Sequence, residues 1–565
     1  MRSFDPDPSV TVTAARGQQV HRRSLKQSAR MARRFNEVAP GVWCLVGNGL
    51  SNQTFIEGPG GVIAIDTGEC VEEMASALTA LRAHTRAPIV AVIYTHFHYV
   101  GGTRAIFDEA GHAVPVYGHE GIARNMARVS GEIAPAYASG LIHQFGLRLP
   151  EDGPDGLVNV GLGAFFRDPN HAPFTPGHIP VTHPWRGGER LAVAGLKVEV
   201  THAPSDSDDS ITLWFPEIGV CVNNLVWPVL YNIFAIRGEA YREPQGMIAS
   251  IDQIIGLAPD HLLGAHGPPI SGADEIRLRT TRYRDSLQFL WDQTVRGLNK
   301  GMTADQLAHS VVLPASADDD YLTTEFYGVA EHHVRQIAAG VRGWFDGDTG
   351  RLFPMEPVER AGRLVEAMGG AGAVRAVVEA ARADNDLRWA LELASWLSAR
   401  EAADEVDRLL LAGVLRDIGY RTKAANIRNW CLTRARDLDG STDLSRLREH
   451  RLRASQLAGM EPRACLHLLR VLLDPDRAAG IDCHIAFRFG EDGQAGLHIR
   501  NGVSVLTEGA RTLSSLSIAY ADLVKVLAGP DSLDAMLASG AAEIHGDVAA
   551  VRRALACFDV PGFRT

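Results

Sequence analysis

The 565-residue sequence predicts three folded regions in series: a layered α/β region, an all-α region and a smaller α+β region. Strand-like runs rich in β-branched residues fill 42–66 and recur near residue 90, which favours a sheet with helices packed on it. From Glu275 the apolar spacing is helical almost without a break. The C-terminal stretch then alternates again as paired strands. A chain of this length has room for about three domains.

The boundaries of these regions follow from changes in the pattern. We predict an extended, polar N-terminal arm over residues 1–40, the α/β region over 41–274, the helical region over 275–437 and the α+β region over 455–565. The arm carries several Arg and Lys residues, but no apolar segment follows them, so it does not read as a signal peptide. We expect it to pack on a partner subunit.

Composition argues against several classes of protein. A formal net charge of -11 argues against a nucleic-acid-binding protein, and no apolar run is long enough to span a membrane. The seven cysteines are scattered without C-x-x-C spacing, which indicates buried thiols in a reducing compartment rather than a disulfide framework. We therefore expect a cytoplasmic protein that binds no nucleic acid.

The α/β region opens with a hairpin, since the Pro59-Gly60-Gly61 turn joins two apolar runs. Residues 112–195 are instead rich in Gly and Pro, and a segment of this kind often forms the mouth of a substrate site. Its histidines His171, His178 and His183 are surface residues or line that mouth. The predicted elements are strands at 42–46, 53–57, 61–66, 90–95 and 196–200 and a helix at 71–84.

Two histidines follow the strand predicted at 90–95. His96 and His98 stand where this strand gives way to a loop that ends at Gly101-Gly102. A turn directly after a strand can bring both imidazoles to one point. Neutral imidazole is the commonest protein ligand of zinc and a good ligand of iron. A bare H-x-H pattern also occurs by chance, so the neighbouring residues decide its meaning.

Residues 95–101, T-H-F-H-Y-V-G, resemble the T-H-x-H-x-D-H motif of the metallo-β-lactamase superfamily. Thr95, His96 and His98 match the motif. Val100 and Gly101 stand in place of its Asp and its last His, which bind the second metal in that superfamily. The resemblance implies that the first region folds as an αβ/βα sandwich.

Later motifs resemble one branch of that superfamily, the alkylsulfatases. With Pro204 aligned on the proline of their A-P-G-T-E-A-P turn, Asp206 takes the position of a metal-binding Glu, although its acidic surroundings also suit a solvated loop. His266 matches the ligand His of an H-G-W-P-type turn. Tyr231 and Arg237 lie in a stretch similar to L-Y-T-L-R-G, whose Arg grips the sulfate; a structural ion pair is the other reading of Arg237.

The resemblance implies a site reduced from two metal ions to one. His96, His98 and Asp206 keep the ligand positions of the family's first metal. The second metal keeps only His266, because Val100, Gly101 and Asn223 replace its ligand Asp, His and Glu. We expect one divalent ion per chain, zinc in preference to iron, although two His and one carboxylate suit both metals. The predicted metal ligands are His96, His98, Asp206 and His266. The predicted catalytic residues are His266, Arg237 and Tyr231.

The rest of the chain continues the resemblance. The helical region is similar to the dimerisation domain of alkylsulfatases, which implies a homodimer. The C-terminal region resembles the sterol-carrier-protein-2-like (SCP-2-like) domain that closes alkylsulfatases, which implies an apolar tunnel or lid suited to alkyl chains.

Three functions therefore stay open. The first is hydrolysis of a sulfate or related ester of a small amphiphilic or anionic substrate. The second is oxidation by a mononuclear non-haem iron enzyme, and the third is non-catalytic binding of lipid-like ligands. The three lost ligands count against standard alkylsulfatase activity, and the four retained ones count against an inactive binder. We favour the metal-dependent hydrolase.

Overall fold

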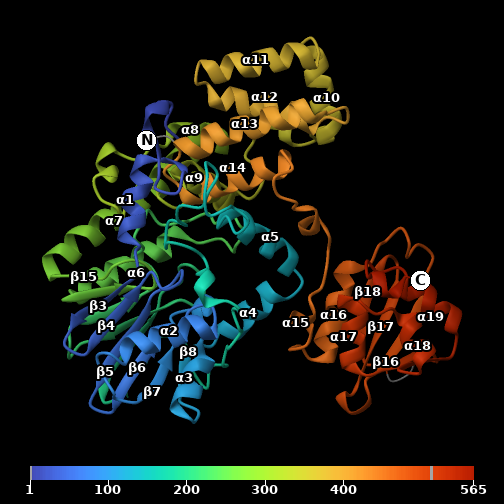
Figure 1. Ribbon diagram of the computed structural model, residues 1–565, viewed down its shortest axis with the longest axis horizontal. Helices are drawn as coiled ribbons and strands as arrows, with labels where there is room; N and C mark the ends of the chain where they lie inside the picture. Colours follow the sequence, from blue (N-terminus) through green and yellow to red (C-terminus); the bar gives the residue numbers. More distant parts are fainter. Residues whose placement is uncertain (1–2, 510–512, 565) are drawn as a thin grey trace. The chain divides into compact units, whose positions relative to one another are not determined.

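The computed structural model describes residues 3–509 and 513–564, which fold as two compact units (Figure 1). The first unit comprises Met1–Met126 and Gly140–Asp443. The second comprises Ala127–Ser139 and Leu444–Thr565. A short segment in the middle of the first unit's sequence thus belongs to the second unit.

Two sheets form the α/β part of the first unit. One has seven strands and the other six, each in sequence order. A single apolar core joins them, with Ile56 and Ile93 from the first sheet and Val198 and Leu213 from the second. The seven-stranded sheet contains β3 (Arg34–Ala39), β4 (Val42–Val46), β5 (Gln53–Gly58), β6 (Gly61–Ile65), β7 (Ile89–Ile93), β8 (Val116–His119) and β9 (His183–Trp185). The six-stranded sheet contains β10 (Arg190–Val193), β11 (Leu196–His202), β12 (Ile211–Phe215), β13 (Val220–Asn223), β14 (His261–Gly264) and β15 (Ile270–Ser271).

Helices pack on both sheets. α2 (Val71–Leu81) contacts β5, and α3 (Thr103–Ala110) contacts β7. α6 (Pro244–Leu257) packs on α7 (Ala273–Leu298), which contacts β14 and β15. Apolar residues at helical spacing explain why α2 forms and docks. Its buried apolar residues are Met74, Ala77, Leu78 and Leu81. The αβ/βα sandwich expected for this region is confirmed.

Strand direction brings three loops to one edge of the sheets. β6 pairs with β7 in parallel, and β13 pairs with β14 in parallel. The loops that follow β7, β11 and β14 carry His96, Asp206 and His266 respectively. Loops at the carboxyl ends of strands are the usual place for a ligand site in an α/β sheet.

The segment predicted to be rich in loops is partly helical. It contains α4 (Ile122–Ser130) and α5 (Ala134–Gln144), followed by a long irregular stretch that leads to β9. At the end of α5, the side-chain oxygen of Gln144 accepts a hydrogen bond from the backbone N–H of Arg237 at 3.2 Å. This end of α5 therefore borders the loop that carries Arg237.

The all-α region follows the second sheet, as predicted. Successive helices from α11 to α14 bury their apolar faces in one core, to which Val378, Leu393 and Ile418 belong. The helices are α8 (Ala304–Ser310), α9 (Ala330–Arg342), α10 (Pro357–Ala367), α11 (Ala371–Ala383), α12 (Leu387–Ala399), α13 (Glu405–Arg421) and α14 (Ala425–Leu438). No helix within residues 3–509 or 513–564 is long and apolar enough to cross a bilayer.

The segment predicted as an extended arm is folded against its own chain. β1 (Thr11–Thr13) pairs with β2 (Gln19–His21), and α1 (Arg22–Arg30) follows directly. The buried side chain of Gln27 donates hydrogen bonds to two loop carbonyls of the same unit at 3.0 Å each. α1 buries polar side chains rather than an apolar stripe, which is why hydrophobic periodicity did not indicate this helix.

His21 makes this N-terminal segment sensitive to acid. Its Nδ1 caps α1 by accepting the Arg23 N–H at 3.1 Å, and burial lowers the pKa of His21 from 6.5 to about 4. The unfolded chain therefore binds the proton more tightly, so this stability is present above pH 6.5 and is lost as the pH falls towards 4. His21→Asn keeps a side-chain acceptor that can cap α1. When the pH is lowered from 7.5 to 4.5, we expect the free energy of unfolding, measured in urea, to fall by about 1–3 kcal/mol less in this variant than in wild type. The same slope in both proteins would contradict this, and the exposed His112→Asn serves as control.

The second unit is an α+β domain, as predicted. Its five-stranded sheet has the order β18-β17-β16-β19-β20, and helices pack on it around a core that includes Phe487. Arg470 forms an ion pair with Glu132, so Ala127–Ser139 is attached to this domain. The strands are β16 (Cys483–Arg488), β17 (Gln494–Arg500), β18 (Val503–Thr507), β19 (Ser515–Ile518) and β20 (Ala542–His545). The helices are α15 (Ala454–Leu457), α16 (Pro462–Leu468), α17 (Tyr520–Ala528), α18 (Leu533–Ser539) and α19 (Val548–Leu555).

Candidate metal centre

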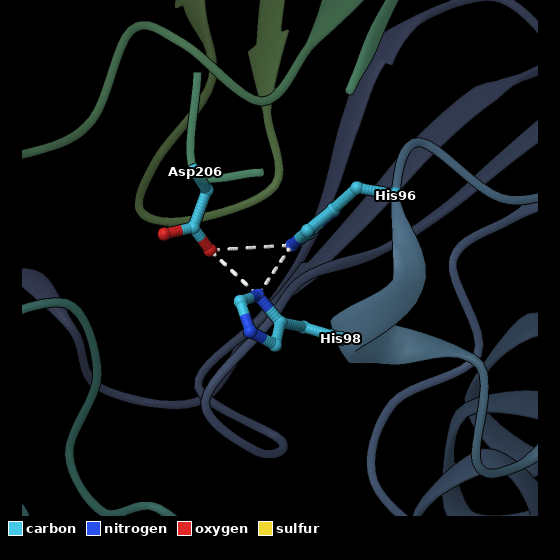
Figure 2. Close-up of side chains that lie close together, drawn as sticks. All are labelled: His96, His98 and Asp206. Carbon is cyan, nitrogen blue, oxygen red and sulfur yellow. Dashed lines mark hydrogen bonds and ion pairs between the residues drawn. The ribbon is translucent and has the colours of Figure 1, made fainter. Parts of the chain in front are cut away.

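Three predicted ligands converge in the first unit (Figure 2). His96 Nε2 lies 3.0 Å from His98 Nδ1, and Asp206 Oδ2 lies 2.7 Å from His98 Nδ1 and 3.4 Å from His96 Nε2. The three donor atoms all lie within 4.8 Å of one another. Two imidazole nitrogens and one carboxylate oxygen are a donor set that divalent zinc and iron both accept. The residues present therefore fit a single divalent ion.

Asp66 fixes the direction of His96. Its carboxylate accepts the Thr95 N–H at 2.8 Å and the Thr95 hydroxyl at 2.7 Å. Because that hydroxyl proton is used, the Thr95 oxygen is left to accept from Nδ1–H of His96, 3.0 Å away. The Nε2 lone pair of His96 then faces the other two ligands, which is the usual arrangement for a metal-binding histidine. Burial raises the pKa of Asp66 to about 6.

Arg242 holds the carboxylate of Asp206. It forms an ion pair with Oδ1 of Asp206 and donates from Nε to the Asp206 carbonyl at 3.2 Å, while both side chains are almost fully buried. A further N–H of Arg242 donates to the Asn232 carbonyl at 2.6 Å. Burial opposes ionisation of Asp206, but Arg242 and His98 outweigh it and hold the pKa of that carboxyl well below its usual range. Oδ2 is thus presented to the histidines as an anion.

Glu239 stands on the other side of His98. Its Oε1 lies 3.5 Å from Nε2 of His98 and 3.1 Å from Nη2 of Arg237. Burial alone would lower the pKa of His98, but Asp206 and Glu239 raise it to about 9. Burial likewise works against the charge of Glu239, yet Arg237 and His98 lower its pKa to about 2. His98 therefore lies between two carboxylates, and each carboxylate is also paired with an arginine.

Arg237 and Tyr231, both predicted as catalytic residues, are buried in the same unit. Nη1 of Arg237 lies 3.5 Å from the Tyr327 hydroxyl, and its charge is paired with Glu239. The Tyr231 ring packs on Trp227 with centroids 4.4 Å apart. Its buried hydroxyl makes no hydrogen bond of standard geometry with the described residues, and Ser205 is its polar neighbour. A buried hydroxyl of this kind is costly unless a ligand or water engages it.

His266 lies outside the group of three ligands. Its Nδ1–H donates to the Leu50 carbonyl at 3.0 Å, and its Nε2 lies 3.2 Å from the Tyr99 hydroxyl. Both ring nitrogens are therefore engaged, and burial lowers the pKa of His266 to about 4. The structure connects His266 to the cluster through Tyr99, whose ring centroid is 5.0 Å from that of His96. Whether His266 also binds metal stays a prediction.

The positions at which the sequence predicts lost ligands of a second metal carry no donor of the expected kind. A Cβ added at Gly101 would lie 2.4 Å from the Glu69 carbonyl oxygen, so this backbone leaves no space for a His there. Asn223 uses its side chain locally: the oxygen accepts two backbone N–H groups at 2.7 and 2.8 Å, and the nitrogen donates to the Leu263 carbonyl at 3.2 Å. Val100 is buried and apolar.

Sequence patterns did not indicate Arg242 or Glu239. Neither belongs to a motif, and the only signal for Arg242 was that a buried Asp206 needs a cation. The histidines considered for the substrate mouth do not join the cluster: none of His171, His178 and His183 belongs to a metal-binding group in the described part of the chain.

The fold and the His–His–Asp group define a metal-dependent hydrolase of the metallo-β-lactamase superfamily, whose family description matches residues 46–222. Two further families match later parts of the chain: alkyl sulfatase dimerisation over residues 303–441 and alkyl sulfatase C-terminal over residues 452–564.

The chain belongs to the alkylsulfatase family. It is 31% identical to a linear primary-alkylsulfatase from Pseudomonas sp. over 89% of this chain and 98% of that protein. It is 28% identical to an (R)-specific secondary-alkylsulfatase from Pseudomonas sp. over 90% of this chain and 78% of that protein. The solved structure of the stereoselective inverting sec-alkylsulfatase Pisa1 from Pseudomonas sp. superimposes with a TM-score of 0.82 at 26% identity, covering 96% of this chain and 87% of that one.

Proposed function

We propose that this protein hydrolyses a sulfate ester of an apolar alcohol at a mononuclear metal site. The observation that carries the proposal is the buried group of His96, His98 and Asp206 in a chain of the alkylsulfatase family. One zinc ion per chain is the occupant we favour, because zinc sites with two His and one carboxylate are hydrolytic. Such an ion supplies Lewis-acid polarisation of the ester and lowers the pKa of a bound water.

Arg237 is the proposed contact for the sulfate group. A guanidinium can donate to two oxygens of an oxyanion at once. In the free protein its charge is balanced by Glu239, so we infer that the bound sulfate shares the guanidinium with this carboxylate. Tyr231 supplies a second donor in this proposal, because its hydroxyl is buried close to Asp206 and Arg237 and makes no hydrogen bond of standard geometry with the described residues. The aromatic rings of Trp227 and Phe145 beside these groups exclude water.

His266 acts in this proposal as a positioning residue through Tyr99. Because Nδ1–H of His266 donates to a carbonyl, its Nε2 accepts the Tyr99 hydroxyl proton. That proton then points away from the cluster, and the Tyr99 oxygen keeps a lone pair to accept a hydrogen bond from the attacking water. A role for His266 as a metal ligand would require its Nε2 to leave Tyr99.

Metal content and sulfate release together test the proposed function. Protein purified without added metal is analysed for zinc and iron and is then assayed with linear primary and secondary alkyl sulfates for inorganic sulfate and alcohol. We expect zinc at the cluster of His96, His98 and Asp206 and metal-dependent sulfate release. In His98→Ala the zinc content should fall by about one per chain, and sulfate release should be lost. If the protein instead contained iron and consumed oxygen in the presence of substrate, the non-haem iron enzyme would be the correct alternative and the hydrolase would be wrong. Metal binding without sulfate release from any alkyl sulfate would refute the substrate class.

We further propose that the chain forms a homodimer through its helical region, with domain boundaries near those predicted from the sequence. The family description that matches residues 303–441 is a dimerisation domain. Within it, apolar side chains are exposed over a short stretch, above all Trp344 at 73% and Phe353 at 92%. Clustered exposed aromatic residues mark an interaction surface.

Charge placed on this stretch is expected to separate the subunits. We expect wild type to sediment as a dimer and Trp344→Glu/Phe353→Glu to sediment mainly as a monomer at micromolar concentration, because large aromatic residues dominate interface energies. Val548→Glu, at an exposed apolar residue of the second unit, is the matched control and should remain dimeric. An unchanged sedimentation coefficient in the double variant would place the interface elsewhere.

A further inference from the structure

A second group of potential metal ligands lies on the sheet of the second unit. Asp482 precedes β16, His484 lies on β16, and His498 lies opposite His484 on β17. One ligand atom from each residue can be chosen so that all three lie within 4.8 Å of one another. These residues belong to a different unit from His96, His98 and Asp206.

The pairing of the two strands brings the imidazoles together. Residues directly opposite in an antiparallel pair have Cβ atoms about 4.5–5.5 Å apart and project to the same face of the sheet. The rings of His484 and His498 accordingly stack with centroids 3.5 Å apart and an interplanar angle of 22°. Strand register therefore fixes two imidazoles side by side without any help from a flexible loop.

The carboxylate completes the group. Nε2 of His498 donates to Oδ1 of Asp482 at 2.7 Å, and this hydrogen bond lowers the pKa of Asp482. Neighbouring ligands of one ion at about 2.0–2.2 Å are themselves separated by about 3 Å, so the observed spacing is close to that of a metal site. Because His484 and Asp482 are exposed, an ion can enter from solvent and keep water in its open positions.

We propose that Asp482, His484 and His498 form a second, solvent-facing site for a divalent transition-metal ion. Two imidazoles and one carboxylate select zinc, copper(II) or nickel(II) over magnesium and calcium, which prefer oxygen ligands. The bound ion cross-links β16 and β17, which are neighbours near the middle of the five-stranded sheet. Binding to the folded state alone raises the thermal stability of this unit.

The number of bound ions tests the proposal in the full-length protein. The chelator-treated chain is dialysed against Zn²⁺ and analysed for metal, with His98→Ala as the background that removes the first cluster. We expect His98→Ala to keep one ion per chain and the triple variant His98→Ala/His484→Gln/His498→Gln to bind none. His545→Ala in the same background is the matched control, because His545, on β20, pairs with Glu543 at 3.5 Å and belongs to no potential metal-binding group among the described residues.

A second readout identifies the ligands. With one equivalent of Cu²⁺, the His98→Ala protein should show nitrogen hyperfine splitting in its electron paramagnetic resonance spectrum, and this splitting should disappear in the triple variant. Zn²⁺ should also raise the thermal midpoint of the second unit in His98→Ala but not in the triple variant. Equal metal content in the two proteins, or a midpoint that Zn²⁺ raises equally in both, would overturn the proposal.

Discussion

Asp206→Ala is expected to remove the metal held with His96 and His98, abolish sulfate-ester hydrolysis and lower the free energy of unfolding by about 3–5 kcal/mol. The metal is lost because one of the three donors that converge in the described part of the chain disappears. The protein is destabilised because Arg242, which is 3% exposed, is left as a buried charge without its carboxylate. Metal content, sulfate release and urea unfolding of the purified variant measure the three effects.

Asp208 provides the matched control for this experiment. It lies two residues further along the same loop, but its ion pair with Arg124 is largely exposed to solvent. Exposed pairs are worth about 0–1 kcal/mol, so Asp208→Ala should keep its metal, its activity and nearly all of its stability. If Asp208→Ala lost metal to the same extent as Asp206→Ala, the alignment that made Asp206 the ligand would be wrong.

Arg242→Met is expected to lower metal affinity by about 10–100-fold and to cost about 3–5 kcal/mol of stability. Arg242 contacts Oδ1 and the backbone carbonyl of Asp206, whereas the atom that faces the histidines is Oδ2. Arg242 therefore orients the ligand carboxylate and balances its charge. Without it, Asp206 is a buried anion, and the ion-free protein is destabilised. Competition with a chromophoric chelator measures the affinity, and unfolding in urea measures the stability.

A double variant separates these two roles of Arg242. Asp206→Asn/Arg242→Met removes both charges, so its stability should return close to that of wild type, while its metal affinity should stay low. Arg124→Met, which removes only an exposed partner of Asp208, should change neither quantity by much. Additive losses in the double variant would show that Asp206 and Arg242 are not coupled.

Much of the fold could be predicted because each region has its own local pattern. β-Branched runs and a Pro-Gly-Gly turn indicated the first sheet, and helical spacing indicated the region after Glu275. The N-terminal segment was missed because α1 is anchored by Gln27, a polar residue whose burial depends on carbonyls more than 130 residues away. Periodicity reports apolar faces, and it cannot report a helix that is held by hydrogen bonds.

In the candidate site, too, some residues could be predicted from the sequence and others could not. His96, His98 and Asp206 follow strands whose ends can be located in the sequence, so their convergence was predictable once the fold was known. The partners of these ligands were not: Arg242 reaches Asp206 across 36 residues, and the loop that carries Glu239 has no regular structure. Side chains that change a ligand's charge lie close to it in space but at no fixed distance along the sequence, so a sequence motif does not identify them.

The discontinuous second unit has a consequence for biosynthesis. Ala127–Ser139 emerges from the ribosome early, but the partner it folds with begins only at Leu444, about 300 residues later. At roughly 5–20 residues per second, this segment waits on the order of 15–60 s before its domain can close. The nascent chain must therefore keep an early segment unassembled while the rest of the first unit is synthesised. The second unit can therefore close only after the stretch from Leu444 onward has been synthesised.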